Sequence, residues 1–399
     1  MKTKYTWLML ISHWIMILGI REDAIPQPPG LVENVGIVQS HLTADEVFLT
    51  YQLTDSSAQV SAIAKESTFF TVQSLDQLFW CSLTAFRKKL KSAEPDNFTV
   101  PGEILYLFLI EPVRSFLNGR HRLIIVPDER LTGLPFEAFI RNDCSTAVDN
   151  SAILNYLVRD FEVIYHDPAE GWNESDHTDP EGVTVTLDDS RFSFMGFSPT
   201  FDKNLQLEAL PGARSEIGEI CALFRQKGLP ASMVLGECSQ KEFFSAIACR
   251  GRIVHLATHC IPDQANDKPG GFLFSACTPR GKSNHLQEAL LTMDDLKMMK
   301  PEADLLVLNG CASSGARLKA GILKSSLTRL FLRAGVRNIL STLWNVTDQL
   351  AKEFMLDFYR SWLSGKTYSE ALRDVKLQWI NRRETAMPTV WAPYVLTGR

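Results

Sequence analysis

The sequence predicts an α/β protein whose sheet is mostly parallel and carries helices on both faces. Two short runs in the second half, Ile253 to Ala257 and Leu305 to Leu308, are almost wholly apolar. Such runs are typical of central strands that are buried on both faces. Segments with helical spacing separate the expected strands, and this rhythm favours parallel strands joined by helical crossovers.

The first half of the 399-residue chain predicts an early sheet, two helices and a buried strand. Alternating apolar and polar residues indicate strands, and apolar positions three or four apart indicate helices. In chain order the expected elements are strands at 46–54 and within 60–72, helices at 74–91 and 104–116, a strand at 122–126 that ends at Pro127, a turn-rich stretch at 128–139, and a helix end running into a strand at 156–165.

The second half follows an acidic segment rich in Gly, Pro and Asp at 167–189, where we place a boundary. The expected elements are a strand at 192–196, a helix fed by a loop through Gly212 and Ser215, strands at 253–257 and 305–308, a helix at 324–334, a strand at 338–343 and a long helix at 349–363. The chain thus divides into an apolar and linker segment at 1–36, a first unit at 37–189 and a second unit at 190–399.

Composition limits the class of protein. With 45% hydrophobic and 22% charged residues, the chain can bury a sizeable core. Its 41 Lys and Arg against 46 Asp and Glu give a net charge of -5, which argues against a large surface for nucleic acid. The eight cysteines are scattered, with neither a CxxC pair nor the spacing of a zinc site. They suit reduced thiols, so we expect a cytoplasmic protein without a metal or organic cofactor.

The N-terminal segment offers an alternative location. The apolar run from Tyr5 to Ile20 follows Lys2 and Lys4 and resembles a signal or anchor segment. It is shorter than the roughly 20 residues that a spanning helix needs. Membrane contact through residues 5–20 is therefore the alternative to a cytoplasmic protein, and an amphipathic or buried helix is a third interpretation.

Reactive side chains directly follow the two apolar runs. Ile253 to Ala257 leads into His259, and Leu305 to Leu308 leads into Cys311. Open parallel sheets place functional groups at the carboxyl ends of their strands. The two residues are 52 positions apart (311 − 259), which allows one crossover and a neighbouring strand. This spacing permits the thiol and the imidazole to meet.

A cysteine beside a histidine can act as a nucleophile. The imidazole of His259 would take the thiol proton of Cys311 and then protonate the departing amine. The backbone N–H groups of Cys260, Gly310 and Cys311 lie in the two loops and are candidates to bind the oxyanion. His255, inside the strand, is interpreted as a core residue.

At these residues the chain resembles the CHAT domain proteases, which group with separases and caspases in one superfamily. The resemblance extends to the C-terminus as ordered blocks. The blocks are LIIVPDERLTGLPFEAF (123–139), LPGARSE (210–216), HLATHC (255–260), VLNGCASSG (307–315), RLFLRAGVRNILSTLWNVTD (329–348) and WAPYVLTG (391–398). Cys260 departs from the family pattern, where Gly is usual, and the residues around Cys311 are closer to those of separases.

The resemblance implies a caspase-like three-layer α/β/α sandwich with a mostly parallel sheet, preceded by a degenerate protease-like subdomain. It implies that 37–189 is this noncatalytic pseudo-protease subdomain and that 190–399 is the active CHAT subdomain. It also implies that His259 and Cys311 are the catalytic dyad.

The block that ends at residue 348 is implied to border the substrate's cleaved residue. Asp348 would bind a basic side chain, and Trp344 would form a wall of the pocket. Two alternatives stay open from the residues themselves: Asp348 caps the helix that begins near Gln349, and Trp344 is a core aromatic.

The sequence therefore predicts a cysteine endopeptidase that cleaves a specific protein partner after Arg, less well after Lys, and that a separate sensor or activator protein triggers. The main alternative is a catalytically inactive scaffold or interaction module with the same fold, and Cys260 is the feature that favours it. A nucleotide-binding domain is a weaker interpretation, because neither GxGxxG nor GxxxxGKS/T follows a strand.

Overall fold

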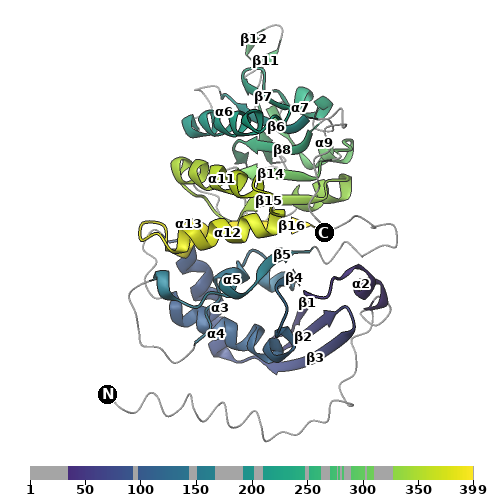
Figure 1. Cartoon of the computed structure of the whole chain (residues 1–399), viewed down its shortest axis with the longest axis vertical. Coiled ribbons are helices and arrows are strands. Elements are labelled where there is room, and N and C mark those ends of the chain that lie inside the picture. Colours follow the sequence, from purple (N-terminus) through teal and green to yellow (C-terminus); the bar gives the residue numbers. More distant parts are fainter. Residues whose placement is uncertain are drawn as a thin grey trace, which may run out of the picture.

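The structure is a computed structural model that describes residues 35–92, 98–142, 151–166, 192–201, 210–247, 251–261, 270–275, 277–278, 281–282, 289–301, 303–309 and 327–398. These residues build one eleven-stranded sheet in the order β3-β2-β1-β4-β5-β16-β15-β14-β8-β6-β7 (Figure 1). Its strands are β1 Glu46–Leu53, β2 Ser57–Ala64, β3 Ser67–Ser74, β4 Arg122–Val126, β5 Glu162–Tyr165, β6 Phe192–Pro199, β7 Ala231–Gly236, β8 Gly251–Ala257, β14 Leu305–Asn309, β15 Asn338–Thr342 and β16 Tyr394–Gly398. Two small sheets lie beside it, one of β9 Cys260–Ile261, β10 Gly271–Leu273 and β13 Leu290–Leu291, the other of β11 Cys277–Thr278 and β12 Gly281–Lys282.

Most neighbouring strands of the large sheet run parallel. The antiparallel pairs are β1 with β2, β2 with β3, and β15 with β16. The first half of the chain supplies β1 to β5 and the second half supplies the rest, and the two sets meet where β5 pairs with β16. The predicted α/β class with a mostly parallel sheet is confirmed.

Helices cover both faces of the sheet (Figure 1). The α-helices are α2 Val35–His41, α3 Gln77–Leu90, α4 Thr99–Leu109, α5 Leu157–Asp160, α6 Pro211–Gln226, α7 Lys241–Ile247, α9 Met293–Lys297, α11 Asp348–Trp362, α12 Tyr368–Ile380 and α13 Pro388–Trp391, and residues 327–334 are also helical. The 3-10 helices are η3 Glu111–Leu117, η4 Glu129–Leu131, η5 Phe136–Ala138 and η6 Ser151–Ile153.

Neighbouring residues of the central strands face opposite layers. In β8, Ile253 belongs to a core that contains residues of α3, α4, α6, α11 and α12. Val254 belongs to a core on the other face, with residues of α7, α9 and 327–334. A third, smaller core joins α2 to β1, β2 and β4. Burial on both faces is the physical reason for the continuous apolar runs in these strands.

Prolines account for two differences between the expected and the observed helices. α4 ends at Leu109 and the 3-10 helix η3 follows from Glu111, because Pro112 lacks the N–H that a continuous α-helix would use. α6 begins at Pro211 instead of after a loop through Ser215, since proline is favoured in the first turn of a helix.

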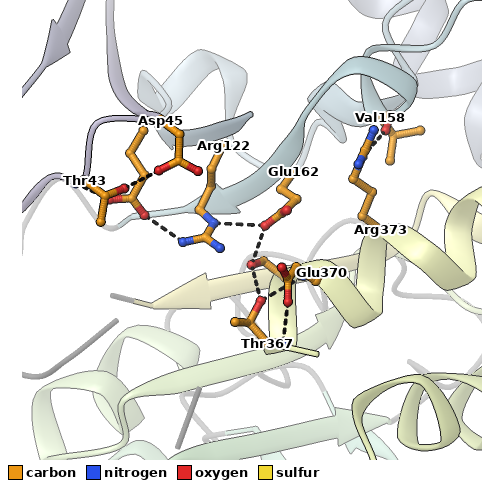
Figure 2. A network of polar contacts seen from close by, with 10 residues as sticks. Thr43, Asp45, Arg122, Val158, Glu162, Thr367, Glu370 and Arg373 are labelled. Atoms are coloured by element: carbon orange, nitrogen blue, oxygen red, sulfur yellow. Dashed lines mark hydrogen bonds and ion pairs between the residues drawn. The ribbon is translucent and has the colours of Figure 1, made fainter. Parts of the chain in front are cut away.

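Hydrogen bonds from helix α12 connect the second half of the chain to the first (Figure 2). Arg122 of β4 donates to Glu46 of β1 at 2.8 Å and to Glu162 of β5 at 2.9 Å. Ser369 of α12 donates to the same Glu162 carboxylate at 2.9 Å, and Arg373 donates to a backbone carbonyl of α5 at 2.8 Å. Burial opposes the charge of Arg122, but the two carboxylates raise its pKa.

A buried ion pair adds to this connection. Lys376 Nζ of α12 lies 2.7 Å from Glu137 Oε1 of η5, and both side chains are almost fully buried. Tyr165 of β5 donates to the other Glu137 oxygen at 2.5 Å. Burial lowers the pKa of Lys376, which Glu137 opposes, and burial together with the Glu137 charge raises the pKa of Tyr165.

Two predictions about the organisation of the chain fall on residues that the structure does not describe. The segment 5–20 is one, and among the described residues no helix is both long and apolar enough to cross a bilayer. The boundary at 167–189 is the other, so the division into 37–189 and 190–399 stays a prediction.

Candidate active site

The two strands that precede the predicted dyad are neighbours in the sheet. β8 and β14 pair in parallel, and their last register pair joins Ala257 to Asn309. His259 follows Ala257 by two positions, and Cys311 follows Asn309 by the same number. Gly310 and Cys311 themselves lie outside the described residues.

The backbone of His259 is held by the strand β10. Its carbonyl oxygen accepts from Leu273 N at 2.9 Å, and the hydroxyl of the preceding Thr258 donates to the Leu273 carbonyl. The His259 side chain is 3% exposed, and its ring lies 5.0 Å from that of Phe201, just after β6. The histidine is therefore fixed at the carboxyl edge of the sheet, between the exits of β6 and β14.

Ser275 ties further loops together at the same edge. Its hydroxyl accepts from Thr200 N at 3.0 Å and lies 2.7 Å from the carbonyl oxygen of Gly236, at the end of β7. Its own N–H donates to Ser239 O at 2.9 Å. These hydrogen bonds hold together the segments that follow β6 and β7, near His259.

Cys260 lies in the short strand β9 and pairs with Phe272 of β10. Its side chain is 1% exposed and belongs to the apolar core of that face. A paired strand uses an extended backbone that any residue can adopt, so cysteine fits where the family pattern has Gly. The predicted oxyanion donors Cys260, Gly310 and Cys311 remain a prediction.

The Asp348 carboxylate lies against the first turn of α6. Its Oδ2 accepts from Gly212 N at 2.5 Å, and a Cβ on Gly212 would also meet this oxygen at 2.5 Å. Only glycine therefore allows this approach. The alternative that Asp348 caps its own helix is wrong, because Thr347 is the N-cap of α11 and Asp348 is its first residue.

Trp344 is half-buried and packs at the margin of the large core. Its indole Nε1 donates to Thr389 O at 2.9 Å, which fixes the ring. Trp344 thus lies on the connection between β15 and α11, and Asp348 begins α11 four residues later.

His255 is fully buried, as its interpretation as a core residue predicted. It does not lie among apolar groups alone, since its Nε2 is 2.8 Å from Glu216 Oε1 and its Nδ1 is 3.0 Å from Tyr359 OH. Glu216 was not among the site residues predicted from the sequence. The signal was present in LPGARSE, where a carboxylate sits four residues after Gly212 on a helix that packs on the sheet.

Within the described part of the chain, no group of three or more His, Cys, Asp or Glu side chains is arranged to hold a metal ion.

A family model described as the CHAT domain matches residues 99–399. The chain belongs to the CHAT domain family. The predicted resemblance is therefore confirmed. The CHAT match begins at the start of α4, before the boundary proposed at 167–189, and includes every described element of the first half from α4 onward.

Two curated relatives resemble part of this CHAT chain. Tetratricopeptide repeat protein 28 of Homo sapiens is 33% identical over 139 residues, and that of Mus musculus is 32% identical over 138 residues. Each match spans 35% of this chain and only 5% of the relative.

Solved structures resemble the fold at low identity. The Saccharomyces cerevisiae separase–securin complex matches with a TM-score of 0.48 and 11% identity, over 92% of this chain and 30% of the other. The Arg-specific cysteine proteinase gingipain R matches with a TM-score of 0.42 and 8% identity, over 79% of this chain and 72% of the other.

Proposed function

We propose that this chain is a cysteine endopeptidase with Cys311 as nucleophile and His259 as general base and acid. The observation that carries the proposal is the parallel pairing of β8 with β14, which ends at Ala257 and Asn309. Neighbouring strands of a sheet are roughly 4.8 Å apart. Equal offsets of two residues beyond this pair support a thiol and an imidazole within reach of one another.

The chemistry follows from these two groups. His259 takes the Cys311 proton, and the thiolate attacks the carbonyl carbon of the scissile peptide. The tetrahedral intermediate collapses to a thioester as the imidazolium protonates the departing amine. Water, deprotonated by His259, then hydrolyses the thioester, releases the acid and restores the thiol. Backbone N–H groups of Cys260, Gly310 and Cys311 are the proposed donors to the oxyanion.

Cleavage after Arg, less well after Lys, is the proposed specificity. Asp348 is half-buried, and the one contact described for its carboxylate uses Oδ2. A carboxylate can accept several hydrogen bonds, so binding Gly212 N is compatible with holding a guanidinium as well. Trp344 would line the same pocket.

A specific protein is the proposed substrate, and a separate sensor or activator is the proposed trigger. The curated relatives are named for tetratricopeptide repeats, which supports a repeat protein as the activating partner. We place the chain in the cytoplasm, where thiols stay reduced, with membrane contact through residues 5–20 as the alternative.

A noncatalytic scaffold of the same fold is the second candidate. The contact of Asp348 with the first turn of α6 favours it, because that contact gives the carboxylate a structural role without any substrate. Under this alternative the protein would bind a partner and cleave nothing.

Peptide cleavage separates the two candidates. Purified protein and its Cys311→Ala variant would be incubated with fluorogenic peptides ending in Arg, Lys, Asp, Leu or Met, with and without a candidate activator. Cys81→Ala is the matched control, since Cys81 is an exposed thiol on α3. Cleavage after Arg that persists in Cys81→Ala and disappears in Cys311→Ala supports the protease, whereas equal cleavage by the Cys311→Ala variant contradicts it.

A further inference from the structure

A chain of buried polar groups lies beneath the exits of β8 and β14. Asn309, the last residue of β14, donates from Nδ2 to both oxygens of Glu216, at 2.8 and 3.0 Å. Glu216 also contacts His255 of β8, which in turn contacts Tyr359 of α11. Glu216 and His255 are 1% and 0% exposed. The Glu216 carboxylate therefore joins α6 to β8 and β14, and His255 extends these contacts to α11.

The directions of these hydrogen bonds follow from chemistry. Burial and the Glu216 charge raise the pKa of Tyr359 well above its usual value, so its hydroxyl keeps its proton. That O–H can donate to His255 Nδ1. Nε2 of His255 lies 2.8 Å from Glu216 Oε1, close enough for an electrostatic contact. The Asn309 amide is the donor that both carboxylate oxygens of Glu216 share.

Such a network is costly unless every partner is present. A buried carboxylate must be desolvated, and an apolar side chain of similar volume at position 216 would avoid that cost. The contacts of Tyr359 with the rings of Phe194 and Phe224 show how apolar the surroundings are. A role beyond packing is therefore the better explanation for a carboxylate here.

We propose that Glu216 is a positioning residue of the active site. By holding the Asn309 amide, it fixes the end of β14, two residues before Cys311 in the sequence. This inference rests on the proposed function and adds to it a residue that acts without touching the substrate. The same helix binds Asp348 through Gly212, one turn before Glu216, so α6 contacts both the nucleophile's strand and the candidate specificity residue.

The test compares folded Glu216→Gln, Asn309→Ala and the double variant. Glu219→Gln is the matched control, because Glu219 is a half-exposed carboxylate on the same helix whose described partners are Ser215 and Lys352. Alkylation of Cys311 by iodoacetamide would be followed by peptide mass spectrometry, with the exposed Cys238 as internal reference. Thermal unfolding of each variant would set a temperature at which all are folded, and kcat and KM would be measured with the best peptide.

In each single variant, the alkylation of Cys311 by iodoacetamide and the turnover of peptide should both be about 10- to 100-fold slower than in the wild-type protein. Small displacements of a reacting group have costs of this size. KM should stay within about twofold, because substrate binding is not the step affected. The double variant should be no slower than the slower single variant, which is the mark of two residues acting as a unit. Glu219→Gln should match the wild-type protein.

The inference would be overturned if Cys311 were alkylated at the wild-type rate in the folded Glu216→Gln and Asn309→Ala variants. Additive losses in the double variant would also overturn it, since Glu216 would then not act through Asn309. Alkylation requires no turnover. A network-dependent alkylation rate in a protein that cleaves no peptide would therefore remove the proposed function and keep the positioning role.

Discussion

At the scale of single residues, the site combines side chains that are fixed by their neighbours. The backbone of His259 is bonded to β10, and Asp348 is bonded to the first turn of α6. Asn309 is bonded to a carboxylate inside the core. Held geometry of this kind is what a nucleophile and its base require, because the reacting groups must already be placed when the substrate arrives.

Asp348→Asn is predicted to lower the preference for Arg over Leu at the cleaved position by about 10-fold or more. The physical reason is the loss of a charge-assisted contact with the guanidinium, while a neutral amide can still accept from Gly212 N. The measurement is kcat/KM on matched Arg and Leu peptides, with the exposed Glu353→Gln on the same helix as control. An unchanged preference for Arg would instead show that Asp348 does not bind the substrate and only bonds the first turn of α6.

Some of these residues could be found from sequence and others could not. His259 and Cys311 were predicted because each follows an apolar strand, a position visible in the pattern. The structure describes His259 at the carboxyl edge of the sheet, and the role of Cys311 stays a prediction. Glu216 was missed because a glutamate on an amphipathic helix is usually solvated, and only the packing of α6 against β8 and β14 shows that this one is buried. The contact of Asp348 with Gly212 spans 136 positions, which no local pattern encodes.

At the scale of elements, α12 makes several polar contacts between the halves of the chain. Its first turns contact β5 and α5, and its Lys376 reaches Glu137 of η5. The sequence analysis did not predict α12 or β16 as elements. Both depend on contacts with the first half, and their own pattern is less distinct than that of the central strands.

Lys376→Met is predicted to destabilise the fold by about 3–5 kcal/mol, because it leaves the buried Glu137 charge without its partner. The double variant Lys376→Met with Glu137→Gln should recover much of this loss, since no uncompensated charge remains. Urea unfolding of both variants measures the difference. A double variant less stable than the single one would show that Glu137 and Lys376 do not act as a pair.

At the scale of the whole molecule, one sheet and one continuous core join the two halves. The largest core contains residues of β1, β4 and α3 from the first half and of β8, α6 and α11 from the second. The mostly parallel sheet was predicted correctly from its apolar runs. That one sheet continues from the first half into the second could not be predicted, because the pairing of β5 with β16 joins residues more than 200 positions apart.

The whole chain is therefore predicted to unfold as one cooperative unit. A shared core cannot expose one half without exposing the apolar face of the other. Hydrogen exchange in increasing urea should show peptides from β4 and from β14 losing protection at the same midpoint. Two well-separated midpoints would instead establish 37–189 and 190–399 as independently stable units.

The dyad itself is tested most directly by mass spectrometry after incubation with an arginyl acyloxymethyl ketone, which alkylates an activated cysteine. One adduct is predicted, on Cys311, that is lost in His259→Ala and retained in His121→Gln, a control at an exposed histidine just before β4. An adduct absent from Cys311, or formed as fast without His259, would contradict a Cys311–His259 protease.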